Sequence, residues 1–184
     1  LLLKSHPHLI NEKNENGMSP LMLAVINDVL WLIQNLIKLG ADVNTTCPLG
    51  NGILHEAIKN FQFDDDIQFK TIKLFINYKA NINAINYELI TPLHLACNRR
   101  NLRLIKLLIR HGADVNAKDL YNNSPLHHSI YGYHGFRALK KPDKVIKTLI
   151  EYGANINEPN KHGTTILHLL CEVATKEDIK FIKQ

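Results

Sequence analysis

The sequence is poor in cysteine, with only Cys47, Cys97 and Cys171 among its 184 residues. A small, odd number excludes a framework of paired disulfides. Cys97 and Cys171 each follow the small-residue position of a recurring phrase, where a buried, reduced thiol fits. We therefore expect a reducing, intracellular compartment, either the cytoplasm or the nucleus.

The motifs of common catalytic and metal sites are also missing. No Gly-rich phosphate loop, Gly-x-Ser-x-Gly turn, His-Glu-x-x-His or Cys-x-x-Cys spacing occurs. The run Asp64 to Asp66 is interpreted as a solvated loop, and His127 and His128 with His134 lack the spacing of a transition-metal site. We expect no catalysis, no cofactor and no metal.

No apolar run is long enough to span a bilayer and no signal peptide begins the chain, so we expect no membrane contact. The chain starts without Met, and its last predicted helix stops before a closing phrase. It is interpreted as part of a longer protein.

What the sequence does contain is repetition. One phrase of four residues starts at Ser19, Gly52, Thr91, Ser124 and Thr165. The steps are 33, 39, 33 and 41 residues, and every copy lies eight residues after an Asn that closes a second phrase. Repeats of this length indicate stacked supersecondary units that bury a shared core.

Each repeat carries its own helix signals. Thr or Ser before Pro opens a first helix, because the hydroxyl accepts a free backbone N–H and Pro needs no donor there. The second segments are rich in apolar residues and end in Gly, for example Gly112, which permits a left-handed cap. Gly17, Gly50 and Gly163 supply a positive φ in the turns and Asn122 can also do so. Leu89 cannot do so comfortably, so we expect the turn before the third repeat to depart from the others.

These phrases resemble the ankyrin repeat family. The third copy reads Thr91-Pro92-Leu93-His94-Leu95-Ala96 and then Gly112-Ala113-Asp114-Val115-Asn116. The resemblance covers nearly the whole chain and implies an all-α solenoid of helix-turn-helix units joined by β-hairpin-like turns. It also implies that His55, His94, His127 and His168 bridge neighbouring turns by hydrogen bonds. The irregular repeats, and a composition that suggests AT-rich codons, resemble the ankyrin arrays of large DNA viruses and intracellular bacteria. This resemblance implies host proteins as targets and the host cytoplasm as one possible location.

The register divides the chain into one array over residues 1–184. Its predicted parts are the end of a repeat (1–11), repeats at 12–44, 45–83, 84–116 and 117–157, and a truncated repeat at 158–184. Six extra residues in the second full repeat and eight in the fourth fall between their two helices. We expect both insertions on one edge, with Asp64 to Asp66 near Arg99, Arg100 and Arg103.

The family binds proteins on the concave face formed by turn tips and first helices. Carried over by register, the exposed positions of the middle repeats hold apolar and aromatic residues, which anchor many interfaces. The candidate protein-binding residues, which include the second insertion, are Ile85, Tyr87, Ile90, Arg99, Leu120, Tyr121, Tyr131, Tyr133 and Phe136. Alternatively, these tips pack against each other to stiffen the turns.

The net charge of +5 raises nucleic acid as a second partner class. We favour a solubilising role for the basic helix surfaces, because the turn tips are neutral or apolar. The sequence thus predicts a monomeric protein-binding module that acts as an adaptor, an inhibitor or a host-directed effector. The alternatives are a structural spacer arm of a larger protein and a basic nucleic-acid-binding surface.

Overall fold

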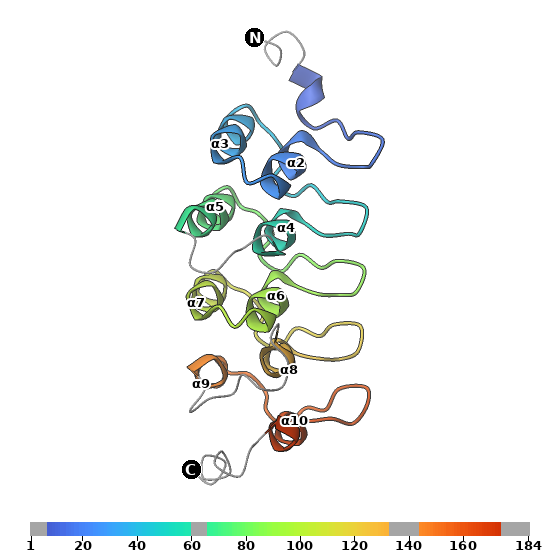
Figure 1. Cartoon of the computed structure of the whole chain (residues 1–184), viewed down its shortest axis with the longest axis vertical. Coiled ribbons are helices and arrows are strands. Elements are labelled where there is room, and N and C mark those ends of the chain that lie inside the picture. Colours follow the sequence, from blue (N-terminus) through green and yellow to red (C-terminus); the bar gives the residue numbers. More distant parts are fainter. Residues whose placement is uncertain (1–6, 60–65, 133–143, 174–184) are drawn as a thin grey trace. The chain divides into compact units, whose positions relative to one another are not determined.

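The computed structural model describes residues 7–59, 66–132 and 144–173. The chain forms two units, Leu1–Tyr87 and Glu88–Gln184, called unit 1 and unit 2. In both units, short helices come in pairs, and a turn leads from one pair to the next (Figure 1). The described residues contain no strand beyond an isolated antiparallel bridge between Thr46 and Gly52. The predicted all-α fold is confirmed.

The elements of unit 1 are a 3-10 helix, η1 (Pro7–Ile10), and the α-helices α2 (Pro20–Ile26), α3 (Leu30–Lys38), α4 (Ile53–Lys59) and α5 (Asp66–Asn77). Those of unit 2 are α6 (Pro92–Asn98), α7 (Leu102–Arg110), α8 (Pro125–Tyr131), α9 (Lys144–Glu151) and α10 (Ile166–Val173).

The first helices begin where the hydroxyl residues predict. Ser19 Oγ accepts the N–H of Met22 at 3.2 Å, and Thr91 Oγ1 accepts the N–H of His94 at 3.4 Å. Pro20 and Pro92 follow as the first helical residues. At these positions the missing proline N–H costs nothing, because the first turn of a helix has no acceptor for it.

The second helices end in a left-handed residue. Gly40, Gly112 and Gly153 have φ angles of 94°, 90° and 88°. Lys79 takes the same role in the second full repeat with a φ of 65°. A glycine adopts this conformation without strain, whereas Lys79 pays a steric cost for its Cβ.

Each unit has a core that runs from one repeat to the next. In unit 1, α2 packs on α3 and α4, and α4 packs on α5. In unit 2, α6 packs on α7 and α8, α8 packs on α9 and α10, and α7 packs on α9. Leu21, Ile33 and Phe75 are fully buried in the first unit, as Leu93 and Leu104 are in the second. A single helix pair could not bury its apolar face alone, so neighbouring repeats stabilise each other.

Both insertions fall between the two helices of their repeats, as predicted. Helix α4 ends at Lys59 and α5 begins at Asp66, while α8 ends at Tyr131 and α9 begins at Lys144. The intervening segments lie outside the described residues. The expected contact between Asp64 to Asp66 and the arginines therefore stays a prediction.

The expected departure at Leu89 is wrong. Leu89 has a φ of 56°, close to the 60° of Asn122 in the next turn, so the turn keeps its form. The bonds that fix the turn outweigh the local cost of a left-handed leucine, which is about 1–2 kcal/mol.

The cysteines are free thiols, and their burial differs from the expectation at one position. Cys47 and Cys97 are buried, but Cys171 is exposed. Burial raises the pKa of the Cys97 thiol, which keeps it protonated and unreactive. The prediction of a buried thiol is confirmed for Cys97 and wrong for Cys171, because that side of α10 is not covered by another helix among the described residues.

Candidate protein-interaction surface

Within each unit, an Asn that closes a repeat ties it to the next repeat. Asn11 Oδ1 accepts the Asp42 N–H, and Asn44 Oδ1 accepts the Asn81 N–H, both at 2.8 Å in unit 1. In unit 2, Asn116 Oδ1 accepts the N–H of Asn155 at 2.8 Å. These bonds span 31 to 39 residues of sequence. They fix the spacing between successive turns.

In three of the turns, a second polar residue three positions after that Asn closes the turn on itself. Asn14 Oδ1 accepts the N–H groups of Asn16 and Met18 at 3.1 and 3.0 Å. Asn160 does the same in the last turn. Such side-chain acceptors mimic a backbone turn and hold its tip in one conformation.

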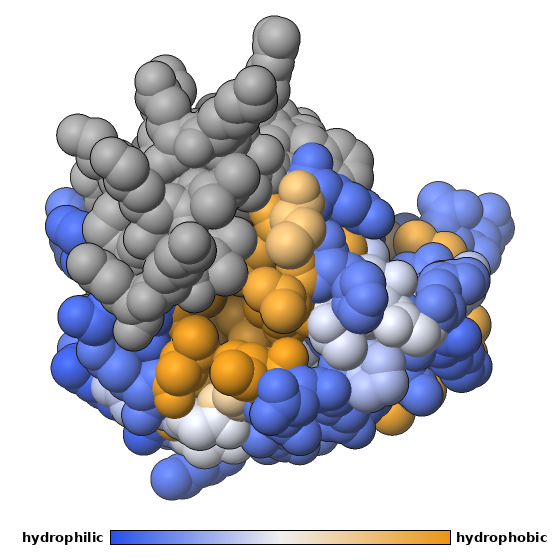
Figure 2. Space-filling model, turned by 90° about the horizontal axis from the view of Figure 1, so that it is seen from below, coloured by the Kyte–Doolittle hydropathy of each residue, from blue (hydrophilic) through white to orange (hydrophobic). Residues whose placement is uncertain are grey.

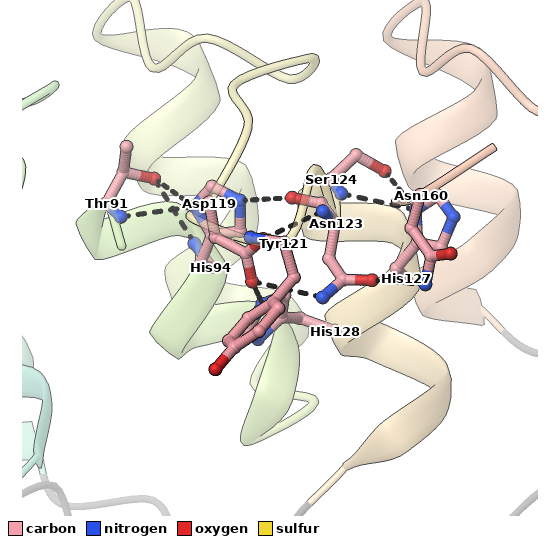
Figure 3. A network of polar contacts seen from close by, with 9 residues as sticks. All are labelled: Thr91, His94, Asp119, Tyr121, Asn123, Ser124, His127, His128 and Asn160. Atoms are coloured by element: carbon pink, nitrogen blue, oxygen red, sulfur yellow. Dashed lines mark hydrogen bonds and ion pairs between the residues drawn. The ribbon is translucent and has the colours of Figure 1, made fainter. Parts of the chain in front are cut away.

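Asp119 occupies this position in one turn of unit 2, where its carboxylate accepts four hydrogen bonds (Figure 3). Its Oδ1 accepts the N–H groups of Tyr121 and Asn123 at 2.9 and 2.8 Å. Its Oδ2 accepts Asn123 Nδ2 at 3.2 Å and His128 Nε2 at 2.9 Å. Burial by itself would raise the pKa of Asp119, but these hydrogen bonds outweigh it and lower the pKa to about 2.

His94 lies beside this carboxylate and extends the network. Its Nδ1 accepts the Thr91 N–H at 3.1 Å and the Thr91 hydroxyl at 2.8 Å, and its Nε2 donates to the Asn123 carbonyl at 3.1 Å. The His128 ring meets it edge to face, with ring centroids 4.9 Å apart. Burial, and to a smaller extent His128, lowers the pKa of His94 to about 4. The ring is therefore neutral near physiological pH.

The predicted bridging role of the repeated His is confirmed for His94 and His127. His94 reaches the turn of the following repeat, and His127 donates from Nε2 to the Thr164 carbonyl at 3.2 Å. His127 Nδ1 accepts the Ser124 hydroxyl at 2.8 Å, and burial lowers its pKa. These side chains are committed to structure, so they are not available as ligands.

The apolar tips are largely exposed. Ile85 and Tyr87 in unit 1 are 55% and 75% exposed, and Leu120 and Tyr121 in unit 2 are 44% and 56% exposed. Tyr131, at the end of α8, is 36% exposed.

Ile90 has to be corrected. It is only 8% exposed, because the residue before the capping Thr91 packs inward under its turn, so a partner cannot reach it.

Both aromatic tips also rest on a neighbouring turn. A Cβ on Gly50 would lie 2.9 Å from the Tyr87 ring, so the ring packs on that glycine. Tyr121 stacks on His162, with centroids 6.4 Å apart. Its carbonyl accepts the Lys161 N–H at 2.9 Å. Packing thus fixes the rings while leaving more than half of each side chain in contact with solvent.

The remaining candidates are placed only in part. Tyr133 and Phe136, together with His134, lie outside the described residues. Arg99 is half-buried at the end of α6. Its neighbour Arg100 donates from Nη1 to the Ser129 carbonyl near the end of α8.

The polar residues of the turns were missed by sequence reasoning. Asp119 was not singled out, and His128 was considered only as a metal ligand, although one signal was available. An Asn or Asp stands three residues after the closing Asn in every turn except that of Cys47, as Asn14, Asn86, Asp119 and Asn160. A recurring short acceptor at one register position indicates a turn residue.

Two further properties hold for the part of the chain that the structure describes. No group of three or more possible metal-ligating side chains comes together there. None of its helices combines the length and the apolar character that crossing a membrane requires.

Paired helices whose turns are tied together across repeats define an all-α repeat protein. The chain belongs to the ankyrin repeat family: a family model described as ankyrin repeats in three copies matches residues 1–86 and 65–144.

Relatives come from animals, bacteria and viruses. The chain is 34% identical to the chicken nuclear factor NF-kappa-B p105 subunit over 117 residues, which is 62% of this chain and 11% of that protein. It is 26% identical over 179 residues to a putative ankyrin repeat protein of Rickettsia bellii, covering 97% of this chain and 65% of the relative. It is 30% identical over 141 residues to the putative ankyrin repeat protein FPV230 of fowlpox virus, covering 61% and 74%. The predicted similarity to viral and bacterial arrays is confirmed.

Proposed function

We propose that the chain binds a partner protein through the tips of its turns and the exposed ends of its first helices. Ankyrin repeats are in general modules for protein–protein interaction. The observation that carries the proposal for this chain is the exposure of Tyr87 and Tyr121 on turns that hydrogen bonds and packing hold in place. A fixed aromatic ring loses little conformational freedom on binding, so its burial contributes more fully to affinity.

The two interpretations of these tips are compatible. Packing on Gly50 or His162 orients one side of each ring, and the exposed side remains for a partner. Ile85 and Leu120 lie on the same turns and extend the apolar area. We expect Tyr131 and Arg99 to contribute from the first helices, and Tyr133 and Phe136 from the second insertion.

The proposal also covers the role of this binding in the cell. A binding array without catalysis suits an adaptor, an inhibitor or a host-directed effector that works as a monomer inside a cell. Relatives in Rickettsia bellii and fowlpox virus support the last of these. The alternative is a spacer arm, in which the tips only stiffen the array.

Affinity capture from a cell lysate tests the proposal. The wild type, a Tyr87→Ala/Tyr121→Ala variant and a Trp31→Ala control are immobilised, and retained proteins are quantified by mass spectrometry. Trp31 is a suitable control because it is 66% exposed but lies on α3, away from the turns. We expect proteins that the wild type and the control retain and the double variant loses.

Two results would contradict the proposal. One is retention of the same proteins by all three forms. The other is a lower melting temperature of the double variant with unchanged retention, which would support stiffening alone.

A further inference from the structure

The second helices of the repeats present an outer surface that the proposed function does not use. On each second helix, we consider the residues nine, six and two positions before the left-handed residue that ends the helix. This spacing puts all three on one face of the helix. In α7 these are Arg103, Lys106 and Arg110, and in α9 they are Lys144, Lys147 and Glu151. We call these six residues the basic face of unit 2.

The structure places this face toward solvent. Leu104, Ile105 and Leu108 of α7 are buried, as are Val145 and Leu149 of α9, so the remaining sides of both helices point outward.

Five members of the basic face are exposed and Lys106 is half-buried. Helix α7 packs on α9 (Figure 1), so the two rows of three lie on neighbouring helices. Five cations and one carboxylate give the face a net charge of +4.

The dimensions of the face follow from helix geometry. Seven residues along a helix rise about 10 Å, and packed helices lie about 8–10 Å apart. Neighbouring charges of the face therefore lie about one Debye length apart or less at physiological salt, so their potentials add. Within the face, Lys147 and Glu151 form an ion pair at 3.9 Å, and both side chains are more than half exposed. Such a pair neutralises little of the field.

Unit 1 holds three cations and no carboxylate at the same six positions, a net charge of +3. They are Trp31, Gln34 and Lys38 in α3, and Lys70, Lys73 and Asn77 in α5, all exposed. The two units differ more in their total charge. The sequence of unit 1 carries 7 Lys and Arg against 8 Asp and Glu, a net charge of −1, while unit 2 carries 15 against 9, a net charge of +6.

We propose that the basic face of unit 2 binds a short acidic segment of a partner protein, independently of the turn tips. An extended segment rises about 3.3 Å per residue, so four to six residues span the face and can set three or four carboxylates against its cations.

The surroundings favour a polypeptide over nucleic acid. The border of the basic face carries Ile150 and Tyr152, which are 46% and 41% exposed. These residues suit an apolar side chain within the acidic segment, as at the rim of a protein interface.

The probe for the test is a fluorescein-labelled 18-residue peptide with the repeat Glu-Glu-Leu, and binding is measured by fluorescence anisotropy. A Glu-Glu-Gly peptide and an oligothymidylate of equal charge are measured in parallel. The variants are Lys106→Glu/Lys147→Glu in unit 2 and the matched Lys70→Glu/Lys73→Glu in unit 1. Both pairs change the net charge by the same amount at exposed or half-buried positions of outer helices.

We expect the unit 2 variant to weaken binding of the Glu-Glu-Leu peptide by about tenfold or more at low salt, and the unit 1 variant by less than about threefold. The Glu-Glu-Gly peptide should bind more weakly than the Glu-Glu-Leu peptide. Far-UV circular dichroism of each variant verifies folding, and Lys→Gln versions replace any variant that does not fold.

Three outcomes would overturn the proposal. Equal losses in the two variants would mean that net charge alone attracts the peptide. Tighter binding of the oligothymidylate, lost in the unit 2 variant, would make the face a nucleic-acid surface. Absence of peptide binding at millimolar concentration would show that the basic face does not bind acidic segments.

Discussion

The first helices of unit 1 and unit 2 differ in their capping boxes, in which a hydroxyl and an imidazole bond backbone N–H groups at the start of the helix. In unit 2, Thr91 with His94 and Ser124 with His127 form complete boxes of hydroxyl, imidazole and backbone N–H groups. In unit 1, Ser19 has Met22 where the His would stand, and His55 has Gly52 where the hydroxyl would stand. The helices nevertheless begin at the same register position in both units. Packing therefore specifies the fold, and the box adds stability and a dependence on pH.

The two units also differ in net charge. Unit 2 has a net charge of +6 and unit 1 a net charge of −1, with equivalent backbones. Repeats can thus differ in surface chemistry while they share a core pattern. Trp31 is the only tryptophan of the chain and lies in unit 1, so its fluorescence distinguishes the unfolding of unit 1 from that of the whole chain.

The largest expected effect is at Asp119. Asp119→Ala leaves part-buried donors of Tyr121, Asn123 and His128 without their acceptor, and we expect a loss of about 3 kcal/mol in the free energy of unfolding. Asn14→Ala, its exposed counterpart in unit 1, should cost about 1 kcal/mol. Urea unfolding followed by circular dichroism measures both.

Asp119→Asn is the matched control for the charge. Because Asn stands at this position in other turns, we expect a loss below about 1 kcal/mol. Equal losses in Asp119→Ala and Asn14→Ala would show that the network of unit 2 adds nothing to an ordinary turn.

The next effect is acid destabilisation through His94. Its pKa is about 4 in the folded chain, whereas the ordinary pKa of a histidine is 6.5. Between these values the unfolded chain binds the proton and the folded chain does not, so stability falls as the pH is lowered through this window. At about pH 5 the loss from this one group is about 2 kcal/mol relative to neutral pH.

His94→Gln removes this titration. We expect a variant that is less stable at neutral pH but loses less on acidification, measured by urea unfolding at several pH values. An unchanged difference between neutral and acidic pH in the variant would exclude His94 as the source.

A smaller effect is expected at the left-handed Leu89. Leu89→Gly relieves the Cβ strain at a φ of 56°, and the 38% exposed side chain contributes limited packing. We expect a gain of about 1 kcal/mol. Asn122→Gly, with the same φ region and a residue that tolerates it, should gain only a few tenths of a kcal/mol. Thermal melting of the two variants compares them, and a destabilised Leu89→Gly would mean that the leucine packs on its neighbours more than its exposure indicates.

The smallest effect tests the incomplete box of unit 1. Gly52→Ser supplies the missing hydroxyl next to His55 Nδ1, and a Cβ at Gly52 has room, with its nearest neighbours at 3.5 and 3.6 Å. We expect a gain of about 0.5 kcal/mol in the transition reported by Trp31 fluorescence. Gly52→Ala supplies the Cβ without the hydroxyl. A gain of equal size in Gly52→Ala would assign the effect to backbone entropy instead of the cap.

Much of the fold could be predicted because its signals are local and repeated. The Thr-Pro or Ser-Pro openings, the closing Gly112 and Gly153 and the lengths between them gave the order of the helices and the site of both insertions. The candidate surface was harder to predict, since exposure depends on neighbours. Tyr87 and Ile90 lie three residues apart, yet one is exposed and the other buried.

The sequence by itself determined the period, the helix starts and stops and the family, because each depends on residues within one repeat. Only the tertiary structure decided which carbonyl His94 reaches, that Leu89 takes a left-handed turn, and that the cations of α7 and α9 lie on neighbouring helices. The bond from His94 to Asn123 and the packing of α7 on α9 join groups 29 or more residues apart, and no local pattern fixes their distances.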